Sequence, residues 1–251
     1  MVGSKDKLQF KMKKIFLLMM LLATVFVACS DDDDDDDKGK PTGKEKLVSK
    51  ISVVENGHNY DILFTYDAQG RITKIVNNDP EGISTTAYTY ETGKIVAKEV
   101  ENEYVITYSL NDKGLIISST NEEGDKSSYT YDANDQLLNV KEGAWETNIT
   151  WQNGNVTKQS LKDNGQEYDT FEYTYSINEY KGNLGWFVGG INEIDAFLMD
   201  YGYMGKRNKN LLQKEGNYSS YEYTLDAEGY VSTIKETSEG EVTTYTITYK
   251  E

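Results

Sequence analysis

A short motif of threonine, an aromatic residue, aspartate and glycine returns along the chain, and it constrains the fold more than any other feature. One copy, FTYDAQG, occupies residues 64–70, and variants include YTYDAND at 129–135 and YTLDAEG at 223–229. The threonine falls at positions 65, 89, 107, 130, 150, 174, 224 and 248, so the spacing is 18 to 24 residues apart from one gap of 50. Such regularity predicts one small structural unit that is used many times.

Each copy of the motif encodes two strands and the turn between them. In FTYD the side chains alternate, so Phe64 and Tyr66 share one face of a strand while Thr65 points to the other. Asp67 begins the turn and can accept hydrogen bonds from the backbone amides ahead of it. Gly70 supplies the positive φ that a three-residue hairpin loop requires. Alternation then resumes in the returning strand.

Further turn sequences lie between the copies, among them Asn56-Gly57, Asn164-Gly165 and Glu239-Gly240. Turns therefore arrive roughly every 10 to 12 residues, which leaves no room for the crossover helices of a parallel sheet. We expect an all-β fold over residues 45–251, in which about fourteen short strands form an antiparallel up-and-down meander. This meander should curl into a barrel-like sheet.

The gap of 50 residues contains a segment, 181–213, that breaks the strand pattern. Within it, Ile191, Ile194, Phe197, Leu198 and Tyr201 recur at helical spacing, which predicts a helix over 191–201 that ends at Gly202. We expect the apolar face of this helix, together with Trp186 and Phe187, to pack into the mouth of the barrel or against the sheet. The alternative is a surface helix that covers a sheet edge.

The N-terminal segment predicts where the protein is located in the cell. Residues 12–28 combine Lys13 and Lys14 with an apolar run that is too short for a membrane span, and Cys29 follows directly. The layout resembles a bacterial lipoprotein signal peptide over residues 1–28, with Met12 as the natural start and Cys29 as the acylated residue. The alternative is an ordinary secretory signal followed by a chance cysteine.

An acidic tether is expected after the cysteine, over residues 29–44. The tract Ser30, Asp31, Asp32 and Asp33, continued by aspartate to position 37, resembles the export signal that sends Bacteroidota lipoproteins to the outer face of the outer membrane. A plain, extended and solvated tether is the alternative, because adjacent like charges repel one another. We therefore expect a lipid-anchored outer-membrane protein displayed on the cell surface.

The repeats also carry a family resemblance. The TYD-xxG copies look like the tyrosine-aspartate (YD) repeats of Rhs-type proteins. Together with the lipoprotein leader and the segment YGYMGKRNKNLLQ (201–213), they make the chain resemble the DUF4595 family of Bacteroidota lipoproteins. That resemblance implies a porin-like fold and an unknown function, and it supplies no catalytic residues.

Charge and composition exclude several classes of function. The chain has 26 Lys and Arg against 42 Asp and Glu, a formal net charge of −16, so we expect no nucleic-acid partner. One histidine and one cysteine leave little for histidine-based catalysis or a Cys/His metal site, and no nucleophile or phosphate-loop motif occurs. We expect no enzyme activity, no metal and no cofactor. A membrane-spanning pore is disfavoured because the strands carry many Lys and Glu.

Binding is the function that the residues favour. Trp145, Trp186 and Phe187 lie outside the aromatic position of the repeat, so they are the candidates for a surface that binds a glycan or a small apolar ligand. Trp151 occupies the aromatic position of the repeat and is expected to be an ordinary strand residue. The alternative function is a structural or adhesive scaffold for a protein partner. Exposure of Trp145 and Trp186 would favour the ligand, and burial of both would favour the scaffold.

Overall fold

The structure, a computed structural model, describes residues 45–185 and 196–250. Within them it has sixteen strands and the helix α2 (Ala196–Asp200). The strands are β1 (Val48–Glu55), β2 (His58–Tyr66), β3 (Ile72–Asp79), β4 (Gly82–Glu91), β5 (Lys94–Glu99), β6 (Val105–Leu110), β7 (Ile116–Asn121), β8 (Lys126–Tyr131), β9 (Leu137–Glu142), β10 (Trp145–Gln152), β11 (Asn155–Asp163), β12 (Gln166–Glu179), β13 (Asn210–Glu215), β14 (Ser219–Leu225), β15 (Val231–Ser238) and β16 (Glu241–Tyr249). No helix in this described part is long and apolar enough to cross a membrane.

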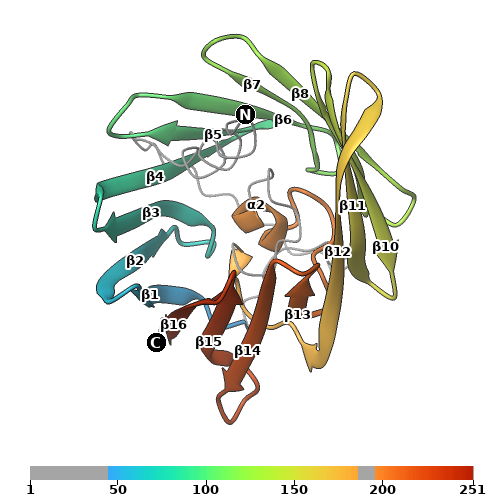
Figure 1. Cartoon of the computed structure of the whole chain (residues 1–251). Helices are drawn as coiled ribbons and strands as arrows, with labels where there is room; N and C mark the ends of the chain where they lie inside the picture. The colour runs from blue at the N-terminus through green and yellow to red at the C-terminus, as the bar shows by residue number, and fades with distance from the viewer. Residues whose placement is uncertain (1–44, 186–195, 251) are drawn as a thin grey trace, which may run out of the picture.

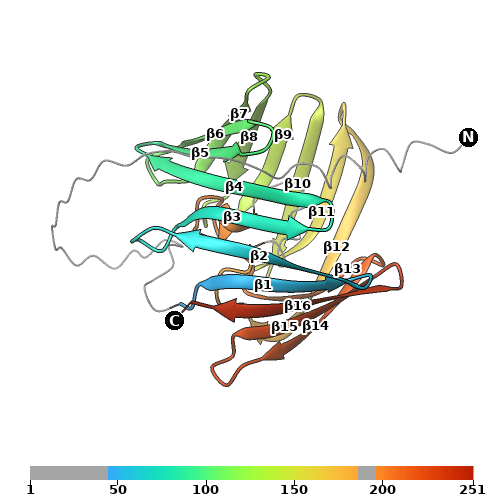
Figure 2. The same cartoon turned by 90° about the vertical axis from the view of Figure 1, so that its left-hand side faces the viewer.

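The strands form one closed antiparallel barrel in simple up-and-down order. Each strand pairs with its neighbours in sequence, and β1 pairs with β16 to close the sheet. Figure 1 looks along the barrel and shows the strands arranged around α2, and Figure 2 shows β1 beside β16 from the side. The expected all-β fold is confirmed, but the expected number of about fourteen strands is two too low. Two further hairpins, between β9 and β10 and between β13 and β14, turn at Gly143 and Gly216, where φ is 56° and 51°.

The turns of the repeat have the predicted chemistry. Oδ1 of Asp67 accepts hydrogen bonds from the backbone amides of Gln69 and Arg71, at 3.0 and 2.9 Å. Asn111, Asp132 and Asp226 accept equivalent pairs of bonds in their own loops. Gly70 has a φ of 76°, as the loop requires. The Asp132 carboxylate therefore stabilises its own turn.

The aromatic residue of the motif holds the ends of paired strands together. The hydroxyl of Tyr66, in β2, donates to the carbonyl of Val48, at the start of β1. Trp151 does the same through Nε1, at 2.7 Å from the carbonyl of Leu137, so it is the strand residue that its position predicts. Equivalent bonds come from Tyr90, Tyr131, Tyr175 and Tyr249. The motif thus supplies a strand clamp as well as a turn.

The insertion occupies residues 180–209, between β12 and β13. It ends at Lys209, before the predicted boundary at 213, because β13 already begins at Asn210. Of the predicted helix 191–201, the structure has α2 at Ala196–Asp200, and Ile191 and Ile194 lie outside the described residues. The predicted stop is confirmed: Gly202 has a φ of 71°, and Tyr203 N–H donates to the carbonyl of Leu198 at 3.0 Å.

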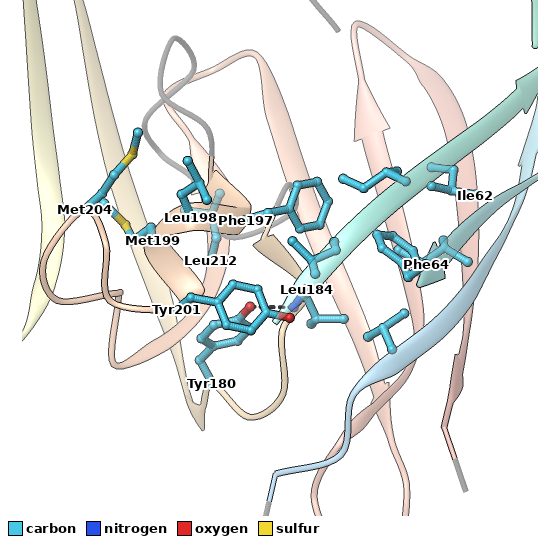
Figure 3. Packing of buried hydrophobic residues seen from close by; sticks show 14 of the residues in the cluster. Ile62, Phe64, Tyr180, Leu184, Phe197, Leu198, Met199, Tyr201, Met204 and Leu212 are labelled. Atoms are coloured by element: carbon cyan, nitrogen blue, oxygen red, sulfur yellow. Dashed lines mark hydrogen bonds between the residues drawn. The ribbon is translucent and has the colours of Figure 1, made fainter. Parts of the chain in front are cut away.

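The insertion packs inside the barrel. Phe197 and Leu198 are only 4% and 0% exposed, and both belong to the main hydrophobic cluster. Figure 3 shows Phe197 directed toward Phe64 of β2, while Met204 and Leu212 lie around Leu198 and Met199. The prediction that this apolar face packs within the barrel is confirmed for the described residues. The alternative of a surface helix at a sheet edge is wrong, because a closed barrel has no edge.

A buried polar cluster fixes the insertion in place. The hydroxyl of Tyr180 lies 2.8 Å from Oδ2 of Asp200, and the same carboxyl oxygen accepts the backbone N–H of Gly185 at 2.6 Å. Arg207 lies over the ring of Tyr180 and donates to Glu45. Every member of this cluster is hydrogen-bonded, as a buried polar group must be to avoid a desolvation penalty.

Candidate functional site

The two ends of the barrel differ in what they carry. Because the strands alternate in direction, consecutive connections lie at opposite ends. The insertion, the aspartate loops such as 67–71 and 226–230, and Glu45 lie at one end, which we name the insertion end. The turns at 56–57, 143–144, 164–165 and 216–218 lie at the other, which we name the far end. The insertion end is therefore occupied by the chain's own residues.

An exposed pair of aromatic side chains lies at the far end. Trp145 is the first residue of β10, and its ring is 5.4 Å from that of Tyr168, in β12, at an interplanar angle of 82°. The two side chains are 45% and 42% exposed. Large aromatic residues that remain this exposed are candidates for ligand contacts, because burying them on a partner is favourable.

A β-bulge brings Tyr168 into this pair. In the ladder of β11 and β12, Leu161 pairs with Asp169 and Lys162 pairs with Glu167, so Tyr168 is the extra residue of β12. A bulge leaves its extra residue unpaired and redirects the local side chains. This irregularity places the Tyr168 ring against Trp145, across the intervening strand β11.

Two carboxylates flank Trp145 on its own face of the sheet. Trp145 pairs with Glu142 of β9 on one side and with Asp163 of β11 on the other. Directly paired residues share a face, with Cβ atoms about 4.5–5.5 Å apart. Glu142 also accepts a hydrogen bond from Ser127 at 3.1 Å. The site thus combines an aromatic surface with hydrogen-bond acceptors.

A second aromatic contact lies nearby at the same end. The ring of Phe171, in β12, is 5.8 Å from that of Tyr218, in the turn between β13 and β14. Tyr218 is exposed and Phe171 is partly buried against the core. Aromatic side chains therefore extend along this side of the far end from β10 to β14.

On the inner wall of the barrel, tyrosines of β2, β14 and β16 donate to carboxylates of β1 and β15. Glu236 accepts hydrogen bonds from Tyr245 at 2.8 Å and from Tyr221 at 3.2 Å, and Glu55 accepts one from Tyr60. Burial, reinforced by these carboxylates, raises the pKa of Tyr221 and Tyr245 above the ordinary phenol value. These hydroxyls remain protonated donors at physiological pH.

A family model described as "Domain of unknown function (DUF4595) with porin-like fold" matches residues 64–233. The chain belongs to this family. The family resemblance expected from the repeats is thereby confirmed, whereas the Rhs-type relationship and the lipoprotein character stay predictions.

Solved structures share the fold of this DUF4595 chain. A porin-like protein from Bacteroides uniformis ATCC 8492 superposes with a TM-score of 0.61 at 20% identity, over 81% of this chain and 98% of that chain. A porin-like protein from Bacteroides vulgatus ATCC 8482 gives 0.59 at 16% identity, over 82% and 99%. Similarity at this level establishes the fold. A search of the curated proteins found no match.

The predicted site residues have different outcomes in this DUF4595 barrel. Trp145 is exposed at the far end, and its role in binding stays a prediction. Trp186 and Phe187 lie outside the described residues, as do Cys29, Ser30, Asp31, Asp32 and Asp33. Their roles therefore stay predictions.

Tyr168 and the carboxylates beside Trp145 were not among the predicted site residues. The only sequence signal for Tyr168 is that it lies outside the aromatic position of the repeat, a property that many of the tyrosines share. Among residues 45–185 and 196–250, no group of three or more His, Cys, Asp or Glu is arranged to hold a metal ion.

Proposed function

We propose that the protein is a non-catalytic binding protein whose ligand is a glycan, held at the far end by Trp145 and Tyr168. The observation that carries the proposal is the exposed ring pair itself, with centroids 5.4 Å apart at an angle of 82°. A flat aromatic face stacks on the apolar C–H face of a pyranose ring, and the burial of both surfaces is favourable.

The surroundings of the pair suit the polar rim of a sugar. Carboxylate oxygens are acceptors for hydroxyl donors, and Glu142 and Asp163 stand on either side of Trp145. A site that joins an apolar surface to a few placed polar groups is the usual design of a small-molecule site.

The proposed location is the outer membrane, with Cys29 as the lipid-modified residue and Ser30 to Asp33 as the export signal. The porin-like fold is compatible with the cell envelope. Glu45 lies at the insertion end, so a tether over 29–44 would join the barrel there and leave the far end directed away from the membrane. The outward residues Glu222, Thr224, Thr246 and Thr248 are exposed and polar, which suits a barrel outside the bilayer.

The test is a glycan array probed with the purified full-length protein in detergent, followed by titration calorimetry on each hit. Replacing Trp145 by alanine should abolish binding, while Leu138→Ala, at a side chain of matched exposure (40%) in β9, should leave it unchanged. Binding that survives Trp145→Ala would overturn the assignment of the site. Silence across the array would instead favour a scaffold for a protein partner.

A further inference from the structure

We propose that the sugar held by Trp145 and Tyr168 carries a positively charged amine, so that amino sugars are the ligand class. This inference rests on the proposed function and adds the charge of the ligand. It comes from how the strands β9, β10 and β11 sort charged residues between the two faces of the sheet.

The outer face of these strands is balanced in charge. Glu146, in β10, pairs with Lys141 of β9 and with Lys162 of β11. Each carboxylate or ammonium there has an opposite charge as its direct cross-strand neighbour, the arrangement that stabilises a sheet surface. Nothing on this face calls for an external ion.

The inner face of the same strands, at Trp145 of β10, is not balanced in charge. Trp145 pairs with Glu142 and Asp163, so two carboxylates flank an aromatic ring. The nearby lysines, Lys141 and Lys162, alternate with these carboxylates along their strands and therefore point to the other face. Glu142 and Asp163 accept hydrogen bonds from the uncharged side chains of Ser127 and Asn164. The face that meets a ligand is thus acidic and aromatic.

Other carboxylates on the inner wall of the barrel carry the same sign of charge. Glu55, in β1, and Glu236, in β15, accept hydrogen bonds from inward tyrosines. The cations Arg71 and Arg207 belong to the insertion end, where Asp67 and Glu45 pair with them. A surface lined by one sign of charge concentrates ligands of the opposite sign. An acidic sugar would be repelled from the far end.

An amine-bearing pyranose meets each of these features. Its ring stacks on an aromatic face, and its ammonium group is attracted both to the carboxylates and to the electron-rich face of Trp145. N-acetylation removes that charge while it leaves the ring in place. The acetylated and free amine forms of one oligosaccharide are therefore a matched pair of probes.

The experiment titrates the full-length protein with glucosamine oligomers, with the same oligomers N-acetylated and with oligogalacturonate. We expect at least about tenfold tighter binding of the free amine form, a preference that weakens as salt rises because charge interactions are screened. The double change Glu142→Gln and Asp163→Asn should abolish the preference. Glu146→Gln, one residue from Trp145 on the outer face, should preserve it.

The outcomes separate the two proposals. Binding of the N-acetylated or acidic oligomers equal to or tighter than that of the amine, with loss in Trp145→Ala, would overturn the amine and keep the glycan site. A preference for the amine that survives the double change would overturn the role of Glu142 and Asp163. Absence of binding to all three probes and to the array would overturn the proposed function itself.

Discussion

The ring of Phe197, in α2, lies 5.6 Å from the ring of Phe64, in β2, at an interplanar angle of 57°. This contact joins the insertion to the barrel wall. It makes the insertion part of the hydrophobic core, because the same cluster includes residues from β1 through β16.

Truncating Phe197 should therefore destabilise the whole barrel. We expect Phe197→Ala to lower the free energy of unfolding by about 3–5 kcal/mol, the usual cost of removing a buried phenylalanine. Denaturant unfolding monitored by circular dichroism measures this. Ile177→Ala, at a side chain 97% exposed, is the control and should change stability by less than about 0.5 kcal/mol. Equal effects of the two changes would contradict the packing of the insertion.

The clamp made by the motif tyrosine predicts a smaller and specific loss. Tyr175→Phe keeps the ring and removes the hydroxyl that donates to the carbonyl of Val156 at 2.7 Å. We expect a loss of about 1 kcal/mol in the free energy of unfolding, as for a typical intramolecular hydrogen bond. Tyr218→Phe, at an exposed turn, should be neutral. If both variants matched the wild type, the hydroxyl would have no part in holding the strands.

Two glycines with nearly the same φ provide a matched comparison. Gly57 has a φ of 80° and nothing within 4 Å of an added Cβ, whereas at Gly205, with a φ of 81°, a Cβ would clash with the carbonyl oxygen of Asp135. Alanine at Gly57 should cost about 1–2 kcal/mol from backbone strain alone. Alanine at Gly205 should cost about 1–3 kcal/mol more, because the insertion must shift. Thermal unfolding of the two variants measures the two losses of stability. A smaller loss at Gly205 than at Gly57 would contradict the close contact between Gly205 and Asp135.

Stability should depend on pH through Asp200. Burial raises the pKa of this carboxyl from 3.8 to about 7, against the opposing charge of Arg207 and the hydrogen bonds from Tyr180 and Gly185. Between these values the folded state holds a proton that the unfolded state releases, so the free energy of unfolding should fall as pH rises from about 4 to about 7. The free energy of unfolding, measured across that pH range, should fall less steeply in Asp200→Asn than in the wild type. An equal fall in the wild type and the variant would mean that the carboxylate is ionised when folded.

Much of this fold can be predicted from short-range sequence patterns within the repeat. The motif residues at 64–70 specify strand, turn and side-chain alternation by themselves, because each depends on neighbours a few positions away. The apolar spacing around Phe197 and Leu198 likewise predicts a buried face. Closure of the sheet was beyond such patterns, since the pairing of β1 with β16 depends on the number and tilt of all the strands.

The candidate site was less predictable for the same reason. Trp145 stands out because it falls outside the repeat, but its contact with Tyr168 depends on a bulge in β12 and on the order of three strands. The neighbours Glu142 and Asp163 become significant only once the register assigns them to one face. Similarly, Tyr180 and Asp200 meet through the path of the insertion, which no local pattern encodes.

The pairing of β1 with β16 also means that the barrel cannot close until the last strand has formed. The backbone donors and acceptors on the β16-facing edge of β1 stay unpaired until β16 has been synthesised and has folded against it. An unpaired strand edge is a template for joining another chain. A chain that crosses a membrane from its N-terminus would therefore depend on a chaperone, or on rapid delivery of its final strand, to avoid self-association before the ring is complete.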